Sequence, residues 1–349
     1  MTEPALMDAI AAAQEPQEET GLTVPLADRY GFPPFSVIDR RSGHWQKRKR
    51  KWNALGLDSS AGRPEGLLLS SKSLAQLGNP GQYDTLNSTS VFDPCLCELA
   101  YDWFSAPGAR VLDPFTGGSV RGVVASRLGR PYTGLDLSRS QVEANYAQIG
   151  LADPECPPLW LQNDGGSQAE LDDWTLPDGD RVREPLPEVA QHGADFVFSC
   201  PPYYDLESYS DGPADLSAMT YPEFLDMYGA IIAGAVNVLL PDRFAAWVIS
   251  DVRDTRGYYR GLVADSIKAF EAAGARLYND IIITDPVGSV AVRAARPFDS
   301  SRKVARLHQH MLVFVKGDPK RASRDLNCQI EAAEAPALGA DAQGTLWGS

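Results

Sequence analysis

The 349-residue sequence has few of the residues that build disulfide or metal sites. It contains only four histidines and an odd number of cysteines, without a CxxC pair: Cys95, Cys97, Cys156, Cys200 and Cys328. In a long chain this pattern does not indicate a disulfide framework, and it leaves little material for a zinc site. We therefore expect neither a structural disulfide nor a bound metal.

Long hydrophobic runs are also missing. No apolar stretch approaches the roughly 18 residues that a membrane-spanning helix needs, and the first twenty residues are acidic rather than signal-like. The hydrophobic content of 44% is nevertheless sufficient for a sizeable core. We expect a soluble, cytoplasmic protein with no membrane partner.

The chain lacks net positive charge, because its formal charge is −14. Two segments depart from this balance: residues 40–52 (RRSGHWQKRKRKW) carry no acidic residue, and residues 293–306 (RAARPFDSSRKVAR) carry a single one, Asp299. Basic segments are often only solvated faces. Two of them in an acidic protein favour a polyanionic partner.

Composition divides the chain into four parts. Residues 1–25 and 318–349 are rich in Ala, Glu, Pro and Gly, which predicts a disordered N-terminus and a flexible tail. Residues 26–86 form an accessory segment that contains the first basic run. Residues 87–317 form the main domain.

The main domain alternates strand-like and helix-like segments. We expect strands at 109–113, 131–137, 159–164, 195–199, 243–250, 275–284 and 308–317, and helices at 119–128, 138–150, 220–240 and 258–274. This alternation predicts an α/β, Rossmann-like fold: a seven-stranded mixed sheet with helices on both faces.

A glycine-rich turn, DPFTGGSVRG (113–122), follows the first of these strands. Gly117 and Gly118 permit close backbone approach, and the following helix offers free N–H groups to a polar ligand. The turn lacks the GxGxxG pattern and is weak evidence alone. The next two strands end near Asp136 and Asp164, which are placed to meet a ribose and an adenine, although either acid could be only a cap or turn residue.

A second unusual stretch is FVFSCPPYYD (196–205), a strand that stops at two prolines with tyrosines behind them. Together, VLDPFTGGSVRG and SCPPY resemble the motifs of the S-adenosylmethionine-dependent amino-methyltransferases that act on DNA, including methylases of phages and restriction systems. STSVFDPCLCELAYDWF (88–104) is similar to their methionine-binding segment. HQHMLVFVKG is similar to their closing strand.

The resemblance implies that the protein is a site-specific DNA methyltransferase of the class I fold in a bacterial or phage-infected cell. It implies S-adenosylmethionine as cofactor and double-stranded DNA as partner. Its motifs assign cofactor binding to Asp113, Phe115, Thr116, Gly117, Gly118, Asp136 and Asp164. They assign catalysis to Cys200, Pro201, Pro202 and Tyr203, with Pro carbonyls orienting the exocyclic amine of cytosine or adenine and Tyr203 stacking on a flipped base.

Cys200 departs from the motif, where the family has Asp, Asn or Ser. The absence of Asp favours cytosine N4 slightly over adenine N6. A cysteine beside a flipped pyrimidine could instead attack C6 and open a route to C5 chemistry, although an inert buried thiol is the simpler interpretation.

DNA contacts are expected from two places: the basic run and the loop 285–306, which we predict to read the target sequence. The candidate residues are Lys47, Arg48, Lys49, Arg50, Arg293, Arg296, Arg302 and Lys303. Three alternatives remain open: C5 modification, the same fold acting on RNA or protein, and a non-catalytic DNA-binding protein. The sequence does not indicate the oligomeric state.

Overall fold

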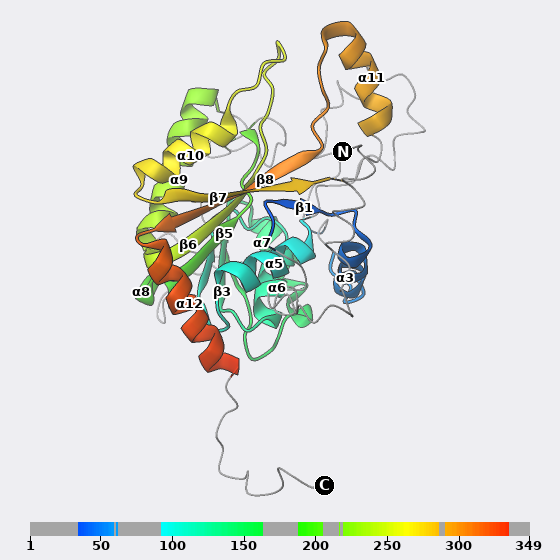
Figure 1. Ribbon diagram of the computed structural model, residues 1–349. Coiled ribbons are helices and arrows are strands. Elements are labelled where there is room, and N and C mark those ends of the chain that lie inside the picture. Colours follow the sequence, from blue (N-terminus) through cyan, green and yellow to red (C-terminus); the bar gives the residue numbers. More distant parts are fainter. Residues whose placement is uncertain are drawn as a thin grey trace, which may run out of the picture.

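The fold was described from a computed structural model, which describes residues 34–58, 61, 92–162, 188–204, 216, 219–285 and 290–334 (Figure 1). Asp164, most of the acidic loop and the start of the 88–104 segment lie outside these residues, as does the side chain of Arg293. In the part of the chain so described, no helix is both long and apolar enough to cross a bilayer.

The described strands form one eight-stranded mixed sheet in the order β1-β7-β8-β6-β5-β2-β3-β4. β8 runs antiparallel to both of its neighbours, and the other pairs are parallel. The strands are β1 (Val37–Asp39), β2 (Val111–Asp113), β3 (Tyr132–Asp136), β4 (Leu159–Gln162), β5 (Ala194–Ser199), β6 (Leu239–Ile249), β7 (Arg276–Thr284) and β8 (His308–Lys316).

Helices connect and cover these strands. They are α3 (Gly43–Asn53), α5 (Pro94–Phe104), α6 (Val120–Arg127), α7 (Arg139–Tyr146), a 3-10 turn (Ile149–Leu151), α8 (Glu188–His192), α9 (Tyr221–Val238), α10 (Leu262–Ala272), α11 (Val290–Ser301) and α12 (Pro319–Glu334). The expected fold class, a Rossmann-like α/β sheet with helices on both faces, is confirmed.

Each face of the sheet has its own hydrophobic core. On one face α3, α5, α6, α7 and α12 pack around Phe196, Phe198 and Met311. On the other face α8, α9 and α10 pack around Trp247 and Phe314. Alternate residues of each strand point to opposite faces, so the continuous apolar runs of β5, β6 and β8 supply both cores at once.

Local sequence signals explain where several helices begin. Ser138 caps α7 by accepting the Gln141 N–H, at the start of the helix expected at 138–150. Thr220 and Glu223 form a capping box at α9, with Pro222 in the first turn. α10 begins later than the predicted Tyr258, because Gly261 has a φ of 88° and Asp251 accepts the N–H groups of Gly261 and Leu262.

The structure corrects three expectations about organisation. The sheet has eight strands instead of seven, because β1 of the supposed accessory segment pairs with β7. The predicted loop 285–306 contains α11. The predicted flexible tail begins with α12, whose Ala322 is buried against the core while Leu326 packs beside it. Residues 34–58 therefore share the core of the main domain.

Candidate functional site

The order of the strands places the candidate site at the carboxyl ends of β2 and β5. From β2 the chain proceeds outwards to β3 and β4, and it then returns to the other side of β2 to form β5. In open α/β sheets, ligands bind in the crevice at such a reversal of strand order. The glycine turn follows β2, and SCPPY follows β5, so the two sequence motifs meet there.

Asp113, the last residue of β2, lies beneath this crevice. Its side chain is fully buried and accepts hydrogen bonds from Ser199 Oγ at 2.5 Å, Arg121 Nε at 2.5 Å, Tyr132 Oη at 2.6 Å and the Phe115 N–H at 3.1 Å. A carboxylate with this many internal donors is committed to the protein. Asp113 thus organises the site from below, instead of presenting a free acceptor to a ligand.

Arg121, on α6, holds the glycine turn in place. Besides Asp113, its guanidinium donates to the carbonyl oxygens of Phe115 at 2.5 Å and Thr116 at 2.9 Å, and it lies over the ring of Phe92. Burial acts to lower the pKa of Arg121, but the adjacent Asp113 carboxylate outweighs it and raises the pKa. The buried ion pair therefore stays charged and fixes the path of the turn.

Gly117 is the point at which the turn meets β3 and α7. Its φ is 49°, which favours glycine. Its N–H donates to Asp136 Oδ2 at 3.0 Å, and its carbonyl accepts from Asn145 Nδ2 at 2.7 Å. The other carboxylate oxygen of Asp136 accepts the Ser138 N–H at 2.8 Å, and the residue is partly exposed beside the turn.

Gly134 of β3 lets the turn lie directly on the sheet. A Cβ atom added there would come within 2.5 Å of Thr116 Oγ1 and 2.8 Å of Thr116 Cβ. Thr116 is itself fully buried and is bonded to Tyr132 Oη at 2.6 Å. Of the predicted cofactor residues, Thr116 is therefore a support of the turn, while Phe115, Gly117, Gly118 and Asp136 are partly exposed.

The start of α6, next to this turn, has a side-chain hydroxyl without a hydrogen-bond partner. Ser119, the N-cap residue, makes no capping hydrogen bond, and its buried Oγ has no hydrogen-bond partner. Helix N-termini attract anionic groups through their free N–H groups. The site thus combines Gly117 with a positive φ, the partly exposed acid Asp136 and the unpartnered buried hydroxyl of Ser119. These features fit a small ligand that carries both a carboxylate and a ribose.

The second motif forms a rigid turn beyond β5. Pro201 is buried, whereas Cys200, Pro202 and Tyr203 are half-buried, and Cys200 Sγ lies 3.7 Å from Tyr203 Oη. The two tyrosines differ in role. Tyr204 is buried and has a φ of 57°, a strained conformation for a bulky residue.

Tyr204 is the anchor that maintains this strain. Its hydroxyl donates to the Met219 carbonyl at 3.0 Å, and its ring packs edge-on against Tyr221 and Phe224. Arg260 lies over the Tyr204 ring at 4.7 Å. The anchored Tyr204 leaves Tyr203 as the tyrosine of this turn that borders the crevice.

The four basic residues of α3 that were predicted to contact DNA divide into two pairs. Arg48 bonds to Glu98 at 2.6 Å, and Lys49 pairs with Asp93 at 3.2 Å, so both are used inside the protein. Lys47 and Arg50 are exposed. The basic run is thus partly a structural feature that docks α3 on α5.

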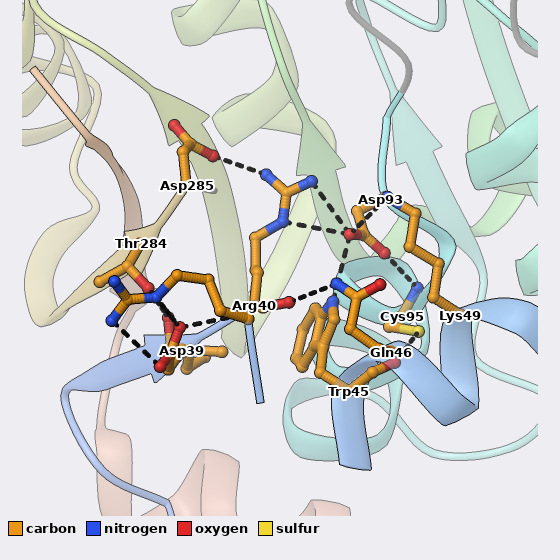
Figure 2. Close-up of polar contacts among 11 residues, drawn as sticks. Asp39, Arg40, Trp45, Gln46, Lys49, Asp93, Cys95, Thr284 and Asp285 are labelled. Atoms are coloured by element: carbon orange, nitrogen blue, oxygen red, sulfur yellow. Dashed lines mark hydrogen bonds and ion pairs between the residues drawn. The ribbon is translucent and has the colours of Figure 1, made fainter. Parts of the chain in front are cut away.

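Asp93 is the centre of this docking (Figure 2). Its carboxylate, 2% exposed, receives the Arg40 guanidinium at 3.0 Å, Trp45 Nε1 at 3.2 Å and Lys49 Nζ at 3.2 Å. Arg40 also bonds to Asp285 at 2.7 Å, directly after β7. One arginine thereby joins the start of the described chain to the residue that follows β7.

The second basic segment contains α11, which lies between β7 and β8 in the chain and projects beyond the sheet (Figure 1). Arg296 and Arg302 are exposed, and Lys303 is half-buried. Sequence reasoning missed their neighbours on the β6–α10 connection, Arg253, Arg256 and Tyr258, because residues 251–257 were assigned to no element or motif and Tyr258 was placed at the start of a helix. It also missed Arg121, Gly134 and Ser199; the glycine inside a strand was the available signal.

Among the described residues, no group of three or more His, Cys, Asp or Glu side chains is arranged to hold a metal ion. None of the five cysteines, all of which lie in the described ranges, forms a disulfide. No family model matches the chain.

Several solved structures align with the chain at low similarity. TrmN from Thermus thermophilus is 15% identical over 64% of this chain, with a TM-score of 0.39; this chain spans about half (49%) of its length. A methyltransferase from Pyrococcus furiosus is 16% identical, covering 72% of this chain and 100% of its own, with a TM-score of 0.39. A second Thermus thermophilus protein, described as a DNA modification methylase, is 19% identical, covering 35% and 44%, with a TM-score of 0.27.

Proposed function

We propose that this protein transfers a methyl group from S-adenosylmethionine to an exocyclic amine, cytosine N4 or adenine N6, in double-stranded DNA. The observation that carries the proposal is the meeting of the two motifs. The Pro-Pro turn after β5 and the glycine turn after β2 stand side by side, joined by the Ser199–Asp113 hydrogen bond of 2.5 Å.

The cofactor fits the residues around the glycine turn. In this proposal Asp136 would accept the ribose hydroxyls, and the turn at Gly117 and Gly118 would let the cofactor approach the backbone closely. Ser119 and the α6 N-terminus would bind the amino-acid carboxylate. Phe115, half-buried and packed on Trp247, offers an apolar wall. When bound, the cofactor supplies an electrophilic methyl group on a sulfonium.

The turn from Cys200 to Tyr203 would activate the amine. An exocyclic amine is a poor nucleophile because its lone pair is delocalised into the ring. Backbone carbonyls at fixed angles would orient its hydrogens so that the lone pair is free to attack the methyl carbon. As the N–CH3 bond forms, the S–CH3 bond would break, the cofactor would leave as a neutral thioether, and one N–H proton would pass to water. Two prolines fix those angles, and the anchored Tyr204 holds the end of the turn.

Tyr203 would hold the extruded base by stacking. Such base–aromatic contacts are worth about 1–3 kcal/mol. Cys200 would shape the pocket as a small, weakly polar residue, since the amine route asks for no thiolate.

The deciding experiment is transfer of labelled methyl groups to unmethylated plasmid DNA, followed by mass spectrometry of the nucleosides. Wild type should yield N4-methylcytosine or N6-methyladenine. Cys200→Ser should yield the same product, and Tyr203→Ala should lose orders of magnitude in turnover with cofactor affinity retained. Tyr278→Ala is the matched control, because Tyr278 lies near the amino end of β7 and the site lies at the carboxyl ends of the strands.

Other products would identify the alternatives. A C5-modified pyrimidine that disappears in Cys200→Ser would replace the amine mechanism with a nucleophilic thiol. Label that enters RNA or protein but not DNA would move the activity to those substrates. Calorimetry that detects DNA binding without cofactor binding would indicate a non-catalytic DNA-binding protein.

A further inference from the structure

The connection from β6 to α10, residues 251–261, forms a rigid hairpin that the proposed chemistry does not use. The Asp254 N–H donates to the Tyr258 carbonyl at 2.8 Å, the Gly257 N–H donates to the Asp254 carbonyl at 2.9 Å, and the Tyr258 N–H donates to Asp254 Oδ1 at 2.9 Å. Gly257 has a φ of 95°, and Arg253 and Tyr259 form a β-bridge at the base. The tip of this β6–α10 hairpin therefore has a fixed shape.

This fixed tip presents a large ring and a guanidinium to solvent. Tyr258 is 70% exposed, and the side chain of Arg256 is 79% exposed. The two lie against each other, with the guanidinium carbon 5.8 Å from the ring centre. A rigid aromatic ring loses little conformational entropy when it contacts a partner, so this is an economical binding element.

The surroundings of the tip are mainly positive. Arg253 and Arg306 lie over the Tyr259 ring at 3.8 and 4.9 Å, and Lys303 packs against the hairpin at Gly257, where an added Cβ would collide with its Cε. The two acids of the hairpin are occupied. Asp254 forms the turn and pairs with Arg256, and Asp251 caps α10. A polyanion is the matching partner.

The hairpin is also joined to the catalytic turn. β6 pairs with β5 in parallel, with Ser199 opposite Trp247, so the carboxyl ends of the two strands lie side by side. The hairpin that follows β6 therefore begins beside the turn Cys200–Tyr204, which follows β5. At its base, Arg260 lies 4.7 Å from the Tyr204 ring centre and 5.1 Å from that of Tyr221. Figure 1 shows the hairpin projecting beyond the sheet on the same side as α11.

We infer that the β6–α10 hairpin enters the DNA duplex beside the target base. Tyr258 stacks in the helix next to the position that the extruded base leaves, while Arg256 and Lys303 contact the flanking phosphates. This inference rests on the proposed function. Extrusion unstacks the target base from its neighbours, and an inserted ring recovers part of that stacking.

The test compares two tyrosines that are both at least half exposed. Tyr258→Ala should lower methylation of unmethylated plasmid DNA about tenfold or more, whereas Tyr258→Phe, which keeps the ring, and Tyr278→Ala, which removes a 50% exposed ring from β7, should stay close to wild type. All variants should keep wild-type cofactor affinity and unfolding midpoints. Arg256→Ala and Lys303→Ala should each reduce the salt dependence of DNA binding, by a slope of about 0.9, and Tyr258→Ala should not.

A mismatch provides the second measurement. Once the methylated base has been mapped, a duplex with a mismatch at that base can be prepared. The mismatched base is easier to extrude, so the methylation rate of Tyr258→Ala should be closer to that of wild type on this duplex than on the matched one. An undiminished deficit would overturn the inference, as would a Tyr258→Ala variant that methylates duplex DNA as well as Tyr278→Ala does. In both cases wild-type activity leaves the proposed function standing. A wild type that methylates no DNA would instead remove the proposed function and the inference with it.

Discussion

Ser199 Oγ donates to Asp113 Oδ1 over 2.5 Å, and both side chains are completely buried. The two residues end neighbouring parallel strands, β5 and β2, and each is the first residue of one of the two motifs. The same carboxylate receives Arg121 and Tyr132. A displacement of either turn is therefore transmitted to the other through a single buried carboxylate.

Asp113→Asn should be strongly destabilising. The substitution removes the only carboxylate that pairs with Arg121 in the described part of the chain and leaves a buried guanidinium without its anion, which typically costs about 3–5 kcal/mol. Ser199→Ala removes one donor and should cost about 1–3 kcal/mol. Urea unfolding measures both.

Asp226→Asn is the control for this pair, because Asp226 is an exposed acid on α9. Its effect should stay within about 0.5 kcal/mol. An Asp113→Asn variant as stable as this control would contradict the assignment of Asp113 as the centre of the site.

Gly134→Ala should lift the glycine turn off the sheet. The new Cβ meets Thr116 Oγ1 and Cβ at 2.5 and 2.8 Å, so Thr116 must move and take Gly117 with it. We expect a loss of about 1–3 kcal/mol in stability, together with weaker cofactor binding by calorimetry. Gly150→Ala, where a Cβ meets nothing within 4 Å, should change neither quantity.

Asp93→Asn should destabilise the fold in a pH-dependent way. Burial acts to raise the pKa of Asp93, but Arg40, Lys49 and the Trp45 donor outweigh it and hold the pKa below its ordinary value of 3.8. A carboxylate with a lowered pKa contributes stability above that ordinary value, and the contribution is lost as the pH falls through the folded-state pKa. Asparagine can still cap α5, so the charge is what the substitution tests.

Urea unfolding at pH 7 and pH 3 measures this effect. The variant should be less stable than wild type by about 1–3 kcal/mol at pH 7, and the gap should narrow at pH 3. A gap that is the same at both pH values would show that the ionised carboxylate is not responsible.

The basic residues of α3 should separate into two functional groups. Replacing Lys47 and Arg50 with Ala should flatten the salt dependence of DNA binding, by a slope of about 0.9 for each phosphate that is no longer neutralised, with little change in stability. Arg48→Ala should mainly lower stability, because it leaves Glu98 without its guanidinium. If DNA binding by the double variant kept the wild-type salt dependence, Lys47 and Arg50 would not contact the DNA backbone.

The core of the fold could be predicted because its strands are buried on both faces and its helices have clear caps. Continuous apolar runs such as Phe196–Phe198 and a cap such as Ser138 are local signals. β1 gave no such signal. Three residues, Val37–Asp39, become a strand only through pairing with β7, which lies far away in the sequence.

The packing of α12 and the inward orientation of two motif side chains could not be predicted, because both depend on tertiary contacts between residues distant in the sequence. The segment containing α12 is polar, yet Ala322 and Leu326, one turn apart, find the core of one face. Asp113 and Thr116 match a binding motif, but only the structure shows that their side chains point inwards to Arg121 and Tyr132. A motif gives the residue types and their spacing, while burial decides which of them can touch a ligand.

The pairing of β1 with β7 has a consequence for synthesis on the ribosome. Asp39 and Arg40 emerge early, but their partners Thr284 and Asp285 follow 245 residues later. At about 5–20 residues per second, roughly 12–50 seconds pass before the edge strand can find its place. β1 is thus made well before the strand with which it pairs, and during translation a chaperone would meet Ile38, which is buried in the folded protein, without that neighbour.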